Sequence, residues 1–79
     1  MRVTRYFVDS VLKRRPELVD LLGHIERALR EPIRTVVQPD GRVRLWVHIP
    51  ESRRYLRVVV EPDGETVHNA FLDRGFREE

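Results

Sequence analysis

Residues 42–49 alternate polar or aromatic side chains with aliphatic ones. Because successive side chains of a strand point to opposite faces of a sheet, this pattern predicts a strand with two unlike faces. The aliphatic face carries Val43, Leu45, Val47 and Ile49. The opposite face carries Arg42, Arg44, Trp46 and His48. Guanidinium groups attract phosphates and aromatic rings stack on bases, so this second face has the chemistry of an RNA-binding surface.

A hairpin further along the chain is predicted to extend this polar face. Pro-Asp-Gly at residues 62–64 indicates a three-residue loop with a bulge, which would place Glu61 opposite Glu65. That register pairs these residues on one face: Val59 with Val67, Arg57 with Asn69, and Tyr55 with Phe71. His68 falls on the opposite, aliphatic face. We expect the aliphatic face to meet the helices and the polar face to remain uncovered.

Two histidines are candidates for acid/base chemistry in RNA cleavage, because an unperturbed imidazole titrates near neutrality, with a pKa of about 6.5. They are His48 on the polar face and His68 in the last strand. The phosphate would be neutralised by Arg44 and Arg57, and a base would stack on Trp46 or Tyr55.

Each candidate also has a structural interpretation. Trp46 on a sheet face can pack against a loop or a partner subunit. The strand arginines can be solvated residues that discourage edge pairing. His24 lies on the polar side of a predicted helix, where we expect it to be solvated.

The elements that would position these residues are two helices followed by four strands. Apolar residues at helical spacing predict one helix over about 5–14 and a second that begins near Pro16 and ends before Pro32. Strands are predicted over about 33–38, 42–49, 55–61 and 65–72, with Pro-Asp-Gly turns after the first and the third. Short connections favour an antiparallel meander. The expected fold is a single α+β domain over residues 1–79, with both helices packed on one face of a four-stranded antiparallel sheet.

Composition narrows the possible functions. The net charge is only +2, and fourteen of the fifteen basic residues are arginine, a bias that genome composition or a hot habitat also explains. No cysteine is present, and no metal-ligand spacing or Gly-rich phosphate loop occurs, so we expect no metal and no cofactor. No apolar run reaches the roughly 20 residues that span a bilayer. A cytoplasmic location without membrane contact is the expectation.

The order of elements, with the segments 55–60 and 66–71, resembles the compact ribonuclease superfamily that includes RelE-type toxins, barnase and colicin nucleases. The resemblance implies that Asn69, which precedes Ala70 and Phe71, and the basic Arg57 lie in an active groove. The chain departs from that pattern because it is less basic than RelE-type toxins. Residues 63–71 also resemble the ending of a group of short prokaryotic proteins.

Two functions are therefore expected from the sequence. The first is a metal-independent endoribonuclease of toxin–antitoxin or mobile-element type, with RNA as substrate and an antitoxin-like protein as partner. The second is a non-enzymatic module that uses the same aromatic and arginine face to bind a protein or a second copy of itself as a homodimer. The salt dependence of binding separates the two.

Overall fold

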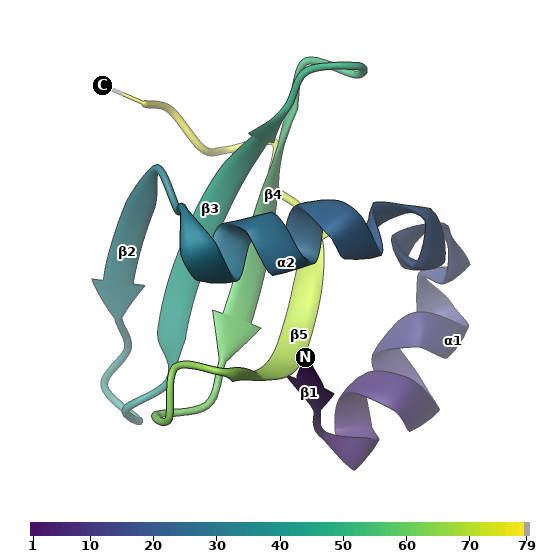
Figure 1. Cartoon of the computed structure of the whole chain (residues 1–79), viewed down its shortest axis with the longest axis vertical. Coiled ribbons are helices and arrows are strands. Elements are labelled where there is room, and N and C mark those ends of the chain that lie inside the picture. Colours follow the sequence, from purple (N-terminus) through teal and green to yellow (C-terminus); the bar gives the residue numbers. More distant parts are fainter. Residues whose placement is uncertain (79) are drawn as a thin grey trace.

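The computed structural model describes residues 1–78 and shows a mixed five-stranded sheet with helices on one side (Figure 1). The strand order is β1-β5-β4-β3-β2. The strands are β1 (Arg2–Val3), β2 (Arg34–Val37), β3 (Val43–Ile49), β4 (Arg54–Val60) and β5 (Thr66–Leu72). The α+β class is confirmed. The four-stranded antiparallel prediction is incomplete, because β1 adds a fifth strand that pairs in parallel with β5.

The two predicted helical regions are present, although neither is a regular α-helix throughout. Residues 5–14 are helical and contain the π-helical turn Phe7–Val11, followed by α1 (Leu12–Arg14). A 3₁₀ turn, Pro16–Leu21, then leads into α2 (Leu22–Arg30). In Figure 1, α2 crosses the face of the sheet and the first helical region lies beside β5. The helices therefore cover both a face and an edge of the sheet.

The core fills the space between the sheet and the helices. It contains the aliphatic side of β3, as the alternation predicted, together with side chains of β4 and β5. Phe7, Val11, Leu18 and Ile25 contribute the helical half, and each is almost completely buried. Burial of this apolar surface is the main free-energy term that holds the two layers together.

The first Pro-Asp-Gly turn has the predicted geometry. The N–H of Gln38 donates to the carbonyl of Arg42 at 2.7 Å, and the N–H of Gly41 donates to the carbonyl of Gln38 at 3.0 Å. Gly41 has a φ of 91°, a conformation that glycine adopts without steric cost. A three-residue loop therefore joins β2 to β3.

The second Pro-Asp-Gly turn differs from the prediction, and the register derived from it is wrong. Glu61 bonds to Thr66 rather than facing Glu65, since its N–H donates to the Thr66 carbonyl at 2.8 Å. The carboxylate of Asp63 explains the longer loop. It accepts hydrogen bonds from the N–H groups of Glu65 and Thr66 at 2.8 and 2.9 Å, and from the Thr66 hydroxyl at 2.6 Å. Such side-chain bonds stabilise a turn in place of ladder bonds.

A β-bulge in β5 moves His68 from its predicted position. Val60 pairs with Val67 while Val59 pairs with Asn69, so His68 is the extra residue. Val67 consequently lies in the core rather than opposite Val59. Contrary to the prediction, His68 is not among the core residues that pack between the sheet and the helices. Beyond the bulge the face assignments are restored, since Arg57 pairs with Phe71 and Asn69 lies two residues away on the same face.

Candidate nucleic-acid interface

The face of the sheet that points away from α2, which we call the outer face, is covered in part by residues 73–78 of the same chain. We call these residues the C-terminal segment; they cross the sheet on the side opposite α2 (Figure 1). Phe76 stacks on Trp46 with ring centroids 5.0 Å apart and contacts Tyr55 at 4.9 Å. Trp46 is only 6% exposed and Phe76 only 7%. The expectation of an uncovered face is therefore wrong, because the chain supplies its own aromatic cover.

Asp73 holds the start of the C-terminal segment against the outer face of the sheet. Its Oδ2 atom accepts hydrogen bonds from Nε1 of Trp46 at 2.9 Å and from Nε of Arg57 at 3.0 Å. Burial opposes ionisation of this carboxyl, but the bonds from Trp46 and Arg57 outweigh burial and lower the pKa of Asp73 below its ordinary value. Arg57 is thus paired with a carboxylate of the chain itself.

Arg34 and Tyr55 hold the far end of the segment. The guanidinium of Arg34 donates to the carbonyl of Arg77 at 3.0 Å and to that of Glu78 at 2.6 Å, and it lies 4.8 Å from the centroid of the Phe76 ring. The hydroxyl of Tyr55 donates to the Glu78 carboxylate. This bond raises the pKa of Tyr55, because it stabilises the protonated phenol beside a negative charge.

The predicted RNA-binding residues divide between two parts of the outer face. Trp46, Tyr55, Arg57 and Phe71 come together, with the guanidinium of Arg57 lying 5.3 Å from the Trp46 ring and 4.8 Å from the Phe71 ring. Arg44 instead donates to the side chain of Gln38 at 2.8 Å. Arg42 pairs with Asp40 and Glu61 near the turns. The last two arginines therefore serve the hairpin loops rather than a common groove.

Asn69 lies on the outer face as predicted, but it is not the cross-strand neighbour of Arg57. Its Oδ1 atom accepts a hydrogen bond of 3.4 Å from Arg15, whose guanidinium also lies 5.5 Å from the ring of Phe71. From the sequence, Arg15 is part of a short basic cluster, Lys13-Arg14-Arg15, which could be a solvated end or extend a phosphate track, but its contact with Asn69 was not predicted. A basic residue beside the predicted start of the second helix was the available signal, but nothing in the pattern placed that start against β5.

The structure does not bring the two candidate histidines together. The ring of His48 lies 5.0 Å from that of Tyr55, at the end of the sheet where β3 turns into β4. His68 stacks on Tyr6 at 4.8 Å near the start of β5, and its Nδ1 lies 3.3 Å from the hydroxyl of Thr4. These positions are at opposite ends of the sheet. One histidine alone can therefore contribute to any single site.

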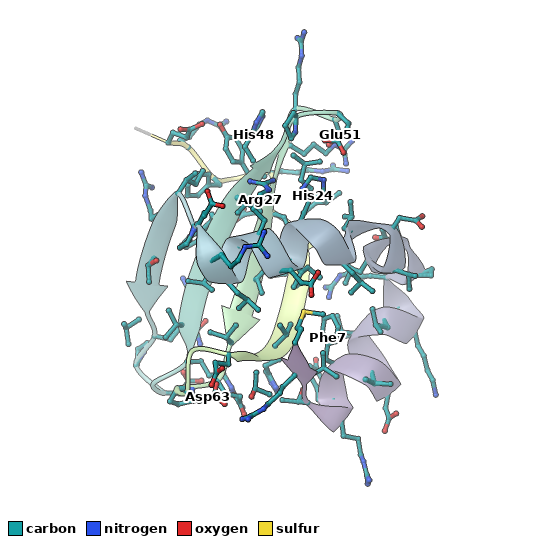
Figure 2. All side chains as sticks on the ribbon, in the orientation of Figure 1. Phe7, His24, Arg27, His48, Glu51 and Asp63 are labelled. Carbon is teal, nitrogen blue, oxygen red and sulfur yellow. The ribbon has the colours of Figure 1, made fainter. Side chains whose placement is uncertain are left out.

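His24 is bonded to protein groups on both sides, so the expectation that it is merely solvated is wrong. Arg27 lies 2.8 Å from its Nδ1, and Glu51 lies 3.1 Å from its Nε2. Arg27 also donates to the carbonyl of His48 at 2.6 Å. Figure 2 shows these four residues gathered where α2 meets the β3–β4 hairpin. The cluster ties the helix to the hairpin and leaves no ring nitrogen of His24 free for chemistry.

An arginine-rich pocket lies beside the C-terminal segment, at the same end of the sheet as His48. We call it the end pocket; it has a volume of about 360 Å³. Its lining residues are Arg53, Arg54, Tyr55, Leu72, Asp73, Arg74, Phe76, Arg77 and Glu78. Both carboxylates are engaged, Asp73 by Trp46 and Arg57 and Glu78 by Tyr55. Arg53, Arg54 and Arg74 form no ion pair with the carboxylates of residues 1–78.

Arg53 occupies its place in the end pocket in an unusual backbone conformation. Its φ is 57°, in the left-handed region that favours glycine, and among residues 1–78 it is the one non-glycine residue there. It closes the β3–β4 turn, where the N–H of Ser52 donates to the Ile49 carbonyl at 3.3 Å. A position suited to glycine thus carries an arginine that lines the pocket.

Within residues 1–78, no three side chains of the types that ligate metals cluster as a metal site would require. The helices described are too short and too polar for any one of them to cross a bilayer. Neither a family model, nor a curated protein, nor a solved structure matches the chain significantly. The predicted relation to compact ribonucleases accordingly stays a prediction.

Proposed function

We propose that this protein binds RNA at the end pocket, with arginines on the phosphates and the adjoining rings against a base. The observation that carries the proposal is the surplus of guanidinium groups around the pocket, where both lining carboxylates already have partners. Phosphate contacts supply most of the affinity in such binding, and aromatic rings add stacking. His48 and Tyr55 provide rings at the same end of the sheet.

The strained backbone at Arg53 gives independent support. A left-handed conformation is unfavourable for a residue with a Cβ atom by about 1–2 kcal/mol, and glycine would relieve it. Strain of this kind is often found at functional sites, where the side chain is needed. An arginine at this turn is therefore consistent with a ligand that requires its charge.

Endoribonuclease activity is a further step that the sequence predicts and that binding alone does not require. His48 is the acid/base candidate for such a reaction, because it lies at the same end of the sheet as the end pocket, whereas His68 lies at the other end. Arg57 is already paired with Asp73, and Asn69 bonds to Arg15, so neither is free to act on a phosphate in this conformation. An antitoxin-like partner stays a prediction tied to this activity.

Binding can be measured by the fluorescence anisotropy of a labelled single-stranded RNA of about twelve nucleotides. The double variant Arg54→Ala with Arg74→Ala should bind at least about tenfold more weakly, and the slope of log Kd against log salt should fall by about 0.7 for each phosphate that is no longer neutralised. The matched control is Arg5→Ala with Lys13→Ala, which removes the same charge from exposed residues outside the pocket. If RNA binding weakened equally in both double variants, the loss would reflect net charge alone, and the proposal would be overturned.

Cleavage is tested in the same samples in the presence of EDTA, with products resolved on a denaturing gel. The endoribonuclease hypothesis requires cleavage by the wild-type protein and its loss in His48→Ala. Intact RNA after prolonged incubation rejects the hypothesis but leaves the binding proposal standing, because binding is measured separately.

The docking of the C-terminal segment favours a second candidate function, a protein-binding module. The outer face already accepts an aromatic ring, a carboxylate and backbone carbonyls from residues 73–78. A partner segment with the same chemistry would fit this face once the chain's own segment has left it. A peptide of residues 73–79 should then bind to a variant that ends at Leu72 but not to the full chain, as measured by calorimetry.

A further inference from the structure

The strand β2 forms one edge of the sheet and pairs on one side only, with β3. All four of its residues are exposed. Val36 is 40% exposed and Val37 is 67% exposed, which leaves two β-branched apolar side chains at the edge. Figure 1 shows no other element of residues 1–78 outside β2. An edge of this composition is a template for pairing with another strand.

The hydrogen-bonding pattern defines which backbone groups are free. The Gln38 N–H bonds to Arg42 across the turn. Because bonded and non-bonded pairs alternate in an antiparallel ladder, Val36 also directs its N–H and C=O groups to β3. Thr35 and Val37 therefore direct theirs to the outer side of β2. Two donors and two acceptors lie along this edge.

The devices that usually protect an edge are absent from β2. Residues 34–37 contain no proline, no lysine and no bulge. Arg34 is the single charged residue of the strand, and its guanidinium is held over Phe76 by the carbonyls of Arg77 and Glu78. The guanidinium of Arg34 therefore lies over the outer face, where it does not discourage pairing at the edge.

We propose that β2 pairs with β2 of a second copy of this chain, antiparallel and about a two-fold axis at Val36, to form one continuous sheet. Thr35 then lies opposite Val37 of the second copy in a bonded pair, and the symmetric pair repeats it, so that all four free groups find partners. The two Val36 side chains meet in the intervening non-bonded pair, where side chains lie closest. Arg34 faces Gln38 of the second copy, so no like charges are directly opposed.

This pairing closes at two copies. A two-fold interface uses the same edge of both molecules and leaves no β2 free. The other edge of the sheet is β1, which has two residues, with the first helical region beside it. A dimer rather than a filament is therefore the expected product, and it is independent of the proposed RNA binding at the end pocket.

Sedimentation equilibrium of the wild-type protein tests the proposal. The wild-type chain should sediment as a dimer. Val36→Lys, which opposes two ammonium groups at the axis, and Thr35→Pro, which removes an outward N–H but no bond to β3, should sediment as folded monomers with unchanged circular dichroism. The matched control Val19→Lys changes a valine that is 56% exposed outside the sheet and should remain dimeric. A monomeric wild-type protein, or a dimer that persists in both edge variants, overturns the proposal.

A cross-link provides a second test that does not depend on weakening the dimer. The chain has no cysteine, so a single Val36→Cys substitution introduces one thiol per copy. In the proposed register two such residues lie at a Cα separation of about 4.5 Å, within the range for a disulfide. Mild oxidation should give a covalent dimer of the Val36→Cys variant and little from Val19→Cys. Equal cross-linking of the two variants would contradict the register.

Discussion

Trp46 and Asp73 are joined by a hydrogen bond of 2.9 Å from the indole Nε1 to the carboxylate Oδ2, and the same oxygen accepts a bond from Arg57 at 3.0 Å. The contact joins the middle of β3 to the first residue after β5. It satisfies a buried indole N–H, and it directs the chain back across the sheet. Much of the architecture of the outer face follows from this one carboxylate.

Replacing Asp73 by Ala should destabilise the protein by about 1–3 kcal/mol, because the indole N–H of Trp46 and the guanidinium of Arg57 lose their shared acceptor beneath the C-terminal segment. Urea denaturation followed by the fluorescence of Trp46, the single tryptophan, measures the change. Asp20→Ala, at an exposed helical position, is the control and should have little effect. Equal stability of the two variants would show that the Asp73 bonds contribute nothing.

Replacing Phe76 by Ala should open the outer face. The ring is buried between Trp46, Tyr55 and Arg34, and its loss should cost about 1.5–3 kcal/mol. The emission of Trp46 should shift to longer wavelength as water reaches the indole. An unshifted spectrum would mean that the C-terminal segment does not cover Trp46 in solution. Val8→Ala, at an exposed position on the first helical region, is the matched control.

The Asp63 turn should make stability depend on acid. Hydrogen bonds from the Thr66 hydroxyl and from the N–H groups of Glu65 and Thr66 lower the pKa of Asp63 to about 2. In the unfolded chain the pKa of an aspartate is about 3.9, so the folded state binds this proton less tightly. The contribution of Asp63 to stability is therefore complete above about pH 4 and is lost as the pH falls toward 2.

Urea midpoints of the wild-type protein and of Asp63→Asn, measured from pH 2 to pH 7, check this expectation. The asparagine keeps an acceptor oxygen but cannot titrate, so the difference in stability between the two proteins should shrink as the pH falls through that window. Asp20→Asn, which removes a carboxylate at an exposed helical position, is the matched control. A constant difference between wild type and Asp63→Asn across the range would refute the assignment.

Arg53→Gly should stabilise the protein by about 1 kcal/mol, because glycine adopts a φ of 57° without strain. The same change should weaken RNA binding if the end pocket acts as proposed. Arg54→Gly is a matched control one residue later, at the start of β4, where a glycine should destabilise instead. Thermal denaturation and anisotropy on the same samples separate the two effects.

Apart from β1, the helical regions and strands were predictable from sequence to within a few residues, because hydrophobic periodicity and turn residues determine them locally. The first hairpin was also predictable in register. The second was not, although both turns read Pro-Asp-Gly, because the side chain of Asp63 bonds to Thr66 and adds a residue to the loop. The bulge at His68 then shifts the ladder once more. Face assignments survive two such shifts, which is why Asn69 and Phe71 were placed on the correct side.

The cover of the outer face could not be predicted from local patterns. Phe76 stands among mostly charged residues, and no periodicity indicates which surface it meets. Its position depends on the Asp73 bonds and on Arg34, a residue far away in sequence. β1 was missed for a similar reason, since a two-residue strand has no recognisable repeat and gains its pairing only once β5 exists. Arg15 reaches the site through the same kind of long-range contact.

The position of β5 in the sheet determines when its neighbouring strands can pair as the chain is synthesised. Of the five strands described, β5 is the last in chain order, yet it lies inside the sheet, between β4 and β1, the first in chain order. Until residues 66–72 have been synthesised, β1 therefore has no partner and one edge of β4 is unpaired. Contacts between the two ends of a chain also slow folding, because a long loop must close before they form.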